Sequence, residues 1–247
     1  MHTLKALFLL CWIPISLYAQ TAEEIIRKAD EKARGLSSYA VIQIDIIRPN
    51  WTRSMEMKSW SKGDKLGLTL ITAPSKDKGT VFLKRDKEIW NWIPSIERNV
   101  KLPPSIMMQS WMGTDFTNDD LVKQSSLVTD YTHKLLKEET IEGRDCFLVE
   151  LLPKPDAAVV WGKIMMWVDK TEFMQMKVAF YDEDDYLISY MLGKDVKMIG
   201  DKMLPTVLEM VPVEEEGHKT VMRYSELKFN IDVSDSFFST QNMKKIR

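Results

Sequence analysis

The first apolar stretch of the chain is short and has flanks of a particular kind. Residues 6–17 are mostly apolar, with Lys5 before them and the small residue Ala19 after them. This order is typical of a secretory signal peptide, because the stretch is too short to cross about 30 Å of hydrocarbon comfortably. We therefore expect residues 1–19 to be removed, and residues 20–247 to form one mature domain.

Residues 21–35 place apolar side chains at helical spacing. Thr21 and Glu24 have the spacing of a capping box at the start, and Gly35 ends the pattern. The stretch predicts one amphipathic helix that packs against a sheet. Its apolar face consists of Ala22, Ile25, Ile26, Ala29 and Ala33.

Beyond this helix, apolar positions alternate with polar ones, which is typical of strands with one buried face. Turn pairs such as Pro49-Asn50 and Gly63-Asp64 separate the runs, so the pattern predicts an antiparallel meander. About eleven strands in one sheet must curl or split. We expect a mainly β fold with a few helices (α+β), in which a curled antiparallel sheet forms an incomplete β-barrel. The strand-like runs are 39–48, 51–60, 66–70, 81–83, 88–93, 131–140, 144–152, 163–169, 174–181, 187–192, 195–199, 206–211 and 219–231.

The middle of the chain interrupts this alternation. A proline pair precedes residues 105–112, which are apolar nearly all round. Thr117 and Asp120 then give a second helix start before residues 118–123. We predict two short helices here. The first must be covered on several sides, and the pattern leaves open whether it is a lid over a cavity or part of the core.

Soft, bulky apolar residues are unusually frequent, with 16 methionines and 8 tryptophans. Methionine is flexible and polarizable, and it is over-used on surfaces that accept varied apolar shapes. Composition alone allows either such a surface or a methionine-rich core. Several of these residues form doublets or alternate, as in Met55/Met57, Met107/Met108, Met165/Met166, Met174/Met176 and Trp90/Trp92.

Little in the sequence points to catalysis or to nucleic acid. The formal net charge is −2, and basic and acidic residues are mixed along the chain. His133 and His218 lack partners at zinc-ligand spacing, and no nucleophile elbow or phosphate-binding loop is present. Asp119 and Asp120 are expected to point apart in a first helical turn. Cys146, the one cysteine of the mature chain, is expected to be a small buried hydrophobic residue. We expect no enzyme activity, no metal and no cofactor.

The stretch PPSIMMQSWMGTDFTNDDL at residues 103–121 resembles the signature block of the LolA-like outer-membrane lipoprotein-sorting proteins, in their longer branch. The resemblance covers essentially the whole mature chain. It implies an unclosed β-barrel with helices as a lid over an apolar cavity. LolA itself closes its lid with an arginine on an early strand. The corresponding region here, residues 60–63, has none, so this role is not carried over.

The resemblance implies a periplasmic carrier, which is a monomer in transient contact with membranes. It would take acyl chains of lipoproteins or lipids from an inner-membrane transporter or exporter and transfer them towards the outer membrane. The alternative is a non-catalytic accessory or partner-binding module of an envelope lipid exporter. The predicted cavity and lid residues are Trp51, Met55, Met57, Leu68, Leu70, Trp90, Trp92, Met107, Met108, Trp111, Met112 and Phe116.

Overall fold

Thirteen antiparallel strands form one continuous sheet in the computed structural model, which describes residues 20–123 and 126–246. The signal peptide predicted at residues 1–19 lies outside the described residues. The strands are β1 Ser37–Arg48, β2 Trp51–Lys62, β3 Leu66–Ala73, β4 Val81–Arg85, β5 Glu88–Ile93, β6 Arg98–Lys101, β7 Tyr131–Ile141, β8 Arg144–Pro153, β9 Lys163–Asp169, β10 Gln175–Tyr181, β11 Leu187–Ile199, β12 Lys202–Pro212 and β13 Lys219–Phe229.

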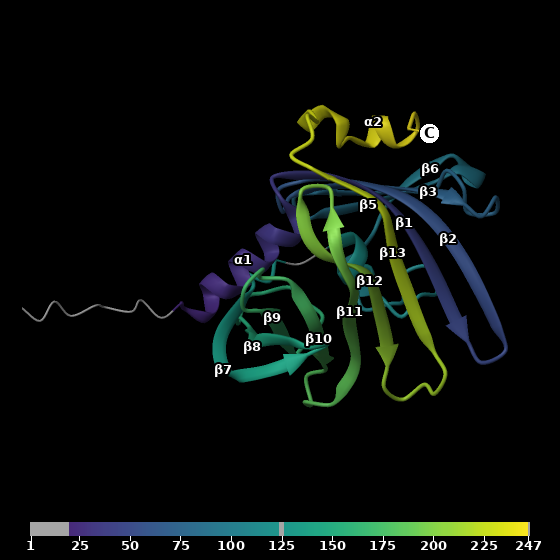
Figure 1. The fold of residues 1–247 in the computed structure, drawn as a ribbon. Helices are drawn as coiled ribbons and strands as arrows, with labels where there is room; N and C mark the ends of the chain where they lie inside the picture. The colour runs from purple at the N-terminus through teal and green to yellow at the C-terminus, as the bar shows by residue number, and fades with distance from the viewer. Residues whose placement is uncertain (1–19, 124–125, 247) are drawn as a thin grey trace, which may run out of the picture.

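The sheet joins two meanders in the order β6-β5-β4-β3-β2-β1-β13-β12-β11-β10-β9-β8-β7. β1 pairs with β13, which brings the two halves of the chain together, while β6 and β7 remain the two edges. The sheet curls without closing (Figure 1), so the predicted fold class is confirmed. Three details of the strand prediction differ. The sheet has thirteen strands instead of about eleven. The runs at 187–192 and 195–199 form one strand, and β6 was not predicted.

The first helix, α1 (Ala22–Arg34), begins as the sequence predicts. The backbone N–H of Glu24 donates to the Thr21 hydroxyl, and the backbone N–H of Thr21 donates to the Glu24 carboxylate. Gly35 ends the helix with φ 67° and ψ −172°, so it takes a positive φ without the full left-handed conformation. Ile25, Ile26 and Ala29 are buried. The helix lies beside β7 and β9 (Figure 1), and Lys32 pairs with Glu172 at 2.7 Å.

Residues 105–112 do not form the predicted helix. A single 3-10 turn, Pro104–Ile106, is followed by irregular chain. The Asn118 side-chain amide donates to the carbonyls of Ile106 and Gln109 at 3.0 Å each. Since these carbonyls are satisfied by a side chain, they need no helical N–H partners. The second predicted helix is present as one π-helical segment, Asp119–Lys123.

The main core lies on the inside of the curl. Trp111 belongs to the middle segment, which is the part of the chain between β6 and β7. Its side chain is 1% exposed, and its ring lies 5.5 Å from that of Phe82 on β4. The middle segment therefore packs against the concave face of the sheet between its two open edges.

A second, smaller core lies on the convex face. The chain after β13 forms a 3-10 turn, Asp235–Phe237, and a short helix, α2 Thr240–Met243. Phe238 and Met243, both 0% exposed, pack against apolar side chains of β3, β4 and β5. Arg85 donates to the Phe238 carbonyl at 2.8 Å, which ties the segment to the sheet. The segment crosses one end of the molecule in Figure 1.

Candidate functional site

A cavity of about 340 Å³ lies inside the curl of the sheet. Its wall is formed by α1, β1, β2, the start of β7, the concave face of β9–β13, Trp161 just before β9, and parts of the chain between β6 and β7. This volume is at the lower end of the range of small-molecule sites, about 300–1,000 Å³. The cavity is therefore large enough for one small ligand or part of a larger one.

One wall of the cavity is a row of apolar side chains that crosses four strands. Met166 is paired with Val178, Val178 with Met191, and Met191 with Met210. Residues directly opposite one another on antiparallel strands share a face, so the register places all four in the wall. Other apolar side chains of the wall are Phe116, Ile164, Phe180, Leu204, Leu208, Met222 and Leu227.

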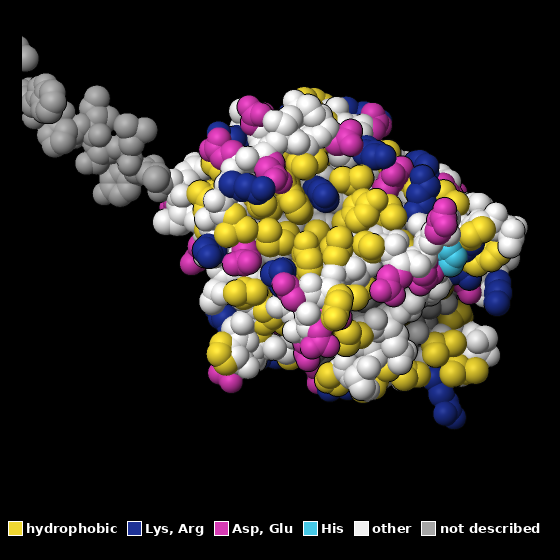
Figure 2. Space-filling view, turned by 90° about the horizontal axis from the view of Figure 1, so that it is seen from below, with side chains coloured by type: hydrophobic (Ala, Val, Ile, Leu, Met, Phe, Trp, Pro, Cys, Tyr) yellow, Lys and Arg dark blue, Asp and Glu magenta, His cyan; other side chains and the backbone are white. Residues whose placement is uncertain are grey.

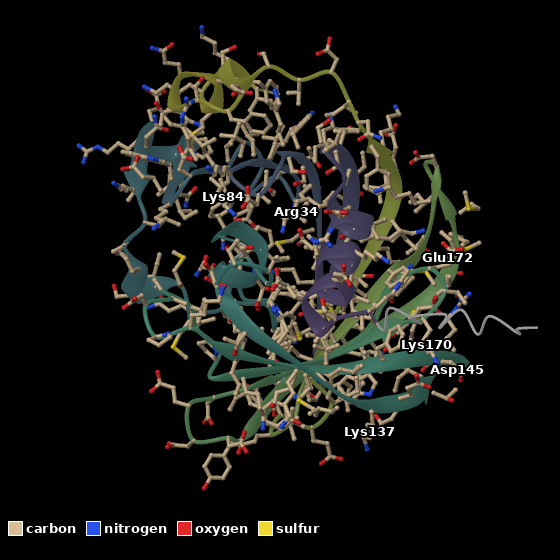
Figure 3. All side chains as sticks on the ribbon, turned by 90° about the vertical axis from the view of Figure 1, so that its left-hand side faces the viewer. Arg34, Lys84, Lys137, Asp145, Lys170 and Glu172 are labelled. Atoms are coloured by element: carbon tan, nitrogen blue, oxygen red, sulfur yellow. The ribbon has the colours of Figure 1, made fainter. Side chains whose placement is uncertain are left out.

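Another part of the lining is polar. Arg34, in the last turn of α1, pairs with Asp30 one turn earlier, with 3.0 Å between Nη2 and Oδ1. Ser38 on β1 and Ser61 on β2 share a hydrogen bond of 2.7 Å between their hydroxyls. Figure 3 shows Arg34 beside α1 near the middle of the view, whereas Lys137, Asp145 and Lys170 lie towards its periphery. The cavity is thus amphipathic.

Asp120 is an acid of the lining whose pKa is shifted. Its carboxylate accepts hydrogen bonds from the backbone N–H of Thr117 at 2.8 Å and from the indole N–H of Trp161 at 3.1 Å. Burial nevertheless raises the pKa of Asp120 to about 6, and the neighbouring charge of Asp119 adds to the shift. Burial, together with Asp119, also raises the pKa of Tyr131, another residue of the lining. This part of the cavity therefore holds negative charge at an energetic cost.

The sequence predictions for these acids concern their direction and their place in a cap. Asp119 and Asp120 were expected to point apart; both line the cavity, and their relative direction stays a prediction. The capping prediction, by contrast, is confirmed, because the Asp120 backbone N–H donates to the Thr117 hydroxyl while the Asp120 carboxylate accepts from Thr117. A capping box in the middle of an apolar block was the signal that could have located this part of the site.

The structure brings only part of the predicted site together. Phe116 lines the cavity. Trp51 is 52% exposed and Met108 is 61% exposed, so both face outwards. Met112 is half-buried against the main core. Four others belong to the main core without lining the cavity, namely Met55, Met57, Met107 and Trp111.

The remaining four predicted residues lie on the convex face. Trp60 is paired with Leu68, whereas Met57 is paired with Ile71 after a register shift in β2. The leucines at even positions of β3 therefore face away from the methionines of β2. They pack under the C-terminal segment instead. The residues concerned are Leu68, Leu70, Trp90 and Trp92.

Other chemically active groups do not form a second site among the described residues. No group of three or more His, Cys, Asp or Glu side chains is placed to hold a metal ion within residues 20–123 and 126–246. Cys146 is buried, as expected, and burial raises the pKa of its thiol to about 11. In the same part of the chain, no helix is both long and apolar enough to cross a membrane.

Comparison with solved structures gives close matches along the chain. A LolA superfamily protein from Nitrosomonas europaea superposes with a TM-score of 0.79 at 26% identity, covering 91% of this chain and 100% of that one. A putative outer membrane lipoprotein-sorting protein domain from Vibrio parahaemolyticus gives 0.79 at 25% identity, with the same coverage. A DUF1329 family protein from Desulfovibrio piger gives 0.81 at 22% identity, covering 90% and 97%.

Comparison of the sequence with family models gives a match to a family that is described only as uncharacterized. No curated protein matches the chain. A family model described as "-like: Uncharacterized protein" matches residues 63–245. Together with the fold and the structural matches at 25% and 26% identity, this result shows that the chain belongs to a LolA-like family.

Proposed function

We propose that this protein is a periplasmic carrier that holds an acyl chain of a lipoprotein or lipid in its cavity, for transfer towards the outer membrane. The observation that carries the proposal is the row Met166–Val178–Met191–Met210, which presents soft apolar side chains to a cavity of about 340 Å³. Each acyl methylene removed from water is worth about 0.8 kcal/mol. Methionine suits this task because it adapts to varied apolar shapes.

The rest of the proposed cycle follows from this binding role. The signal peptide predicted at residues 1–19 would export the chain, and an inner-membrane transporter or exporter would supply the cargo. The protein would act as a monomer without catalysis or cofactor. The second candidate, an accessory module of an envelope lipid exporter, is favoured by the exposed Tyr186, Ile188 and Val213 at strand ends. Hydrophobic side chains are widespread on the face in Figure 2, which such a partner could cover.

Uptake of a fluorescent long-chain acyl probe by delipidated protein tests the proposal. Met191→Asp places a charge in the cavity wall and should weaken saturable uptake about tenfold or more. Met198→Asp is the matched control, because Met198 lies on the same strand but is 59% exposed. Uptake that is absent in the wild type, or equal in the two variants, would contradict a carrier role for this cavity.

A further inference from the structure

One buried hydroxyl of the cavity lining lacks a hydrogen-bond partner. Tyr131, the first residue of β7, lines the cavity and is 1% exposed. Among the residues that the structure describes, no hydrogen bond joins its hydroxyl to another group. Buried polar groups are nearly always hydrogen-bonded, so one without a partner calls for an explanation. Because Tyr131 belongs to the lining, a ligand in the cavity can supply the partner.

This hydroxyl is a hydrogen-bond donor at any physiological pH. Burial, followed by the charges of Asp119, Asp130 and Asp120, raises the pKa of Tyr131, so the phenol keeps its proton. A protonated phenol can donate one hydrogen bond. A carbonyl oxygen of a ligand would accept this bond without bringing a charge into a desolvated space.

Asp120 supplies an acceptor in the same part of the cavity. Its charge is one of the causes that raise the pKa of Tyr131, which places the two groups within electrostatic range of each other. Its carboxylate accepts from Thr117 and from the indole N–H of Trp161. An ionised carboxylate offers about four acceptor positions, so these contacts do not fill it. This part of the lining therefore presents a donor, Tyr131, and an acceptor, Asp120.

The donor and the acceptor also adjoin the apolar wall. The ring of Trp161, whose indole N–H donates to Asp120, lies 4.9 Å from the ring of Phe180 in that wall. A ligand whose chain lies along Phe180 would bring its polar end beside Asp120.

From this arrangement we propose that the cavity prefers acyl chains joined through a secondary amide to acyl chains joined through an ester. The inference rests on the proposed function, since it concerns the polar end of a ligand whose chain occupies the same cavity. The amide carbonyl would accept from the Tyr131 hydroxyl, and the amide N–H would donate to Asp120. An ester has the carbonyl but turns an oxygen without a proton towards the Asp120 carboxylate. A site that hydrogen-bonds an N–H discriminates against the analogue that lacks it.

A matched pair of ligands tests this preference. N-methyldodecanamide and methyl dodecanoate differ only in the N–H that replaces an ester oxygen, and 1-chlorododecane supplies a similar chain without a carbonyl. Each is used to displace a neutral fluorescent acyl probe. An amide loses more than an ester on leaving water, so a purely apolar cavity would bind the ester more tightly.

We expect the reverse at about pH 7.5, with the amide bound about tenfold or more tightly than the ester. Equal affinities, or tighter binding of the ester, would overturn the inference while leaving the carrier proposal intact. Displacement by none of the three ligands would contradict both.

Variants test the two groups separately. In Tyr131→Phe, which removes only the hydroxyl, the affinity for N-methyldodecanamide should fall about tenfold while that for 1-chlorododecane does not fall. In Asp120→Asn, whose neutral oxygen is a weaker acceptor, the ratio of amide to ester affinity should fall about fivefold. Tyr186→Phe, at a side chain that is 69% exposed, is the control.

The Tyr131→Phe result stands on its own if Asp120→Asn does not fold. An unchanged amide affinity in Tyr131→Phe, or an equal fall for the amide and 1-chlorododecane, would refute the role of the hydroxyl. An unchanged ratio in folded Asp120→Asn would refute the role of the carboxylate.

Discussion

Arg48 and Asp115 form a bidentate ion pair between the end of β1 and the middle segment. Their contacts measure 3.0 Å between Nη1 and Oδ2 and 2.9 Å between Nη2 and Oδ1. The side chains are only 11% and 6% exposed. The Thr220 hydroxyl also lies 2.6 Å from Asp115 Oδ2. This pair joins the first strand, the last strand and the segment that carries Phe116 and Asp120.

Breaking this pair should destabilise the protein strongly. Removal of one partner leaves a buried charge unpaired, which typically costs about 3–5 kcal/mol. Arg48→Met should therefore lower the free energy of unfolding in urea by about 3 kcal/mol or more. Lys197→Met is the control, because Lys197 and Asp195 form a pair with both side chains more than half exposed. That variant should change stability by less than about 1 kcal/mol. Similar losses in both variants would contradict this account.

The C-terminal segment should be essential to stability as well. Phe238 is 0% exposed and fills the second core beneath the segment. Phe238→Ala removes buried apolar area and leaves a cavity, so we expect a loss of about 3–5 kcal/mol. Ile96→Ala, at a side chain that is 55% exposed, should cost less than about 0.5 kcal/mol. Thermal or urea unfolding measures both, and a small effect at Phe238 would show that the segment is only loosely attached.

Local signals in the sequence predicted local structure well. The pair Thr21 and Glu24 marked the start of α1, and Thr117 with Asp120 marked the start of the π-helical segment, because capping depends on residues three apart. The alternation of apolar and polar positions also predicted a curled antiparallel sheet, since its period reflects which side chains share a face.

Longer-range relationships were not predictable in the same way. Alternation in β3 shows that Leu68 and Leu70 share a buried face, but it does not show what covers that face. Here the cover is Phe238 and Met243, about 170 residues later in the chain. For the same reason Met191 and Met210 were not predicted in the cavity, since their position there depends on the curl of the whole sheet and not on their neighbours in sequence.

The free energy of unfolding should depend on pH through Asp120. Burial raises its folded-state pKa from 3.8 to about 6, so the folded protein holds this proton more tightly than the unfolded chain does. The stability associated with the protonated carboxyl is therefore full below about pH 4 and is lost as the pH rises through 6. Between about pH 5 and pH 8, the free energy of unfolding of the wild-type protein should fall by about 1–2 kcal/mol relative to that of Asp120→Asn.

Urea unfolding of both proteins at the two pH values measures this difference. Other groups titrate in both proteins, so their contributions cancel in the comparison. Asp185→Asn provides a control for removing an exposed carboxylate. A difference between Asp120→Asn and wild type that is independent of pH, or that favours the wild type at pH 8, would show that Asp120 is not strained by burial.

The indole of Trp161 should keep the pKa of Asp120 from rising further. Its N–H donates to Asp120 Oδ1 at 3.1 Å, and a hydrogen bond to the charged form lowers the pKa of a carboxyl. Trp161→Phe removes the donor but retains an aromatic ring next to Phe180. We expect the pKa of Asp120, followed by the chemical shift of its carboxyl carbon, to rise above about 6 in this variant. Trp51→Phe, at an exposed side chain on β2, should leave that pKa unchanged. If the pKa stayed constant or fell in Trp161→Phe, the indole would not be a significant donor to this carboxylate. The carboxylate of Asp120 would then be positioned by its hydrogen bond from Thr117 alone.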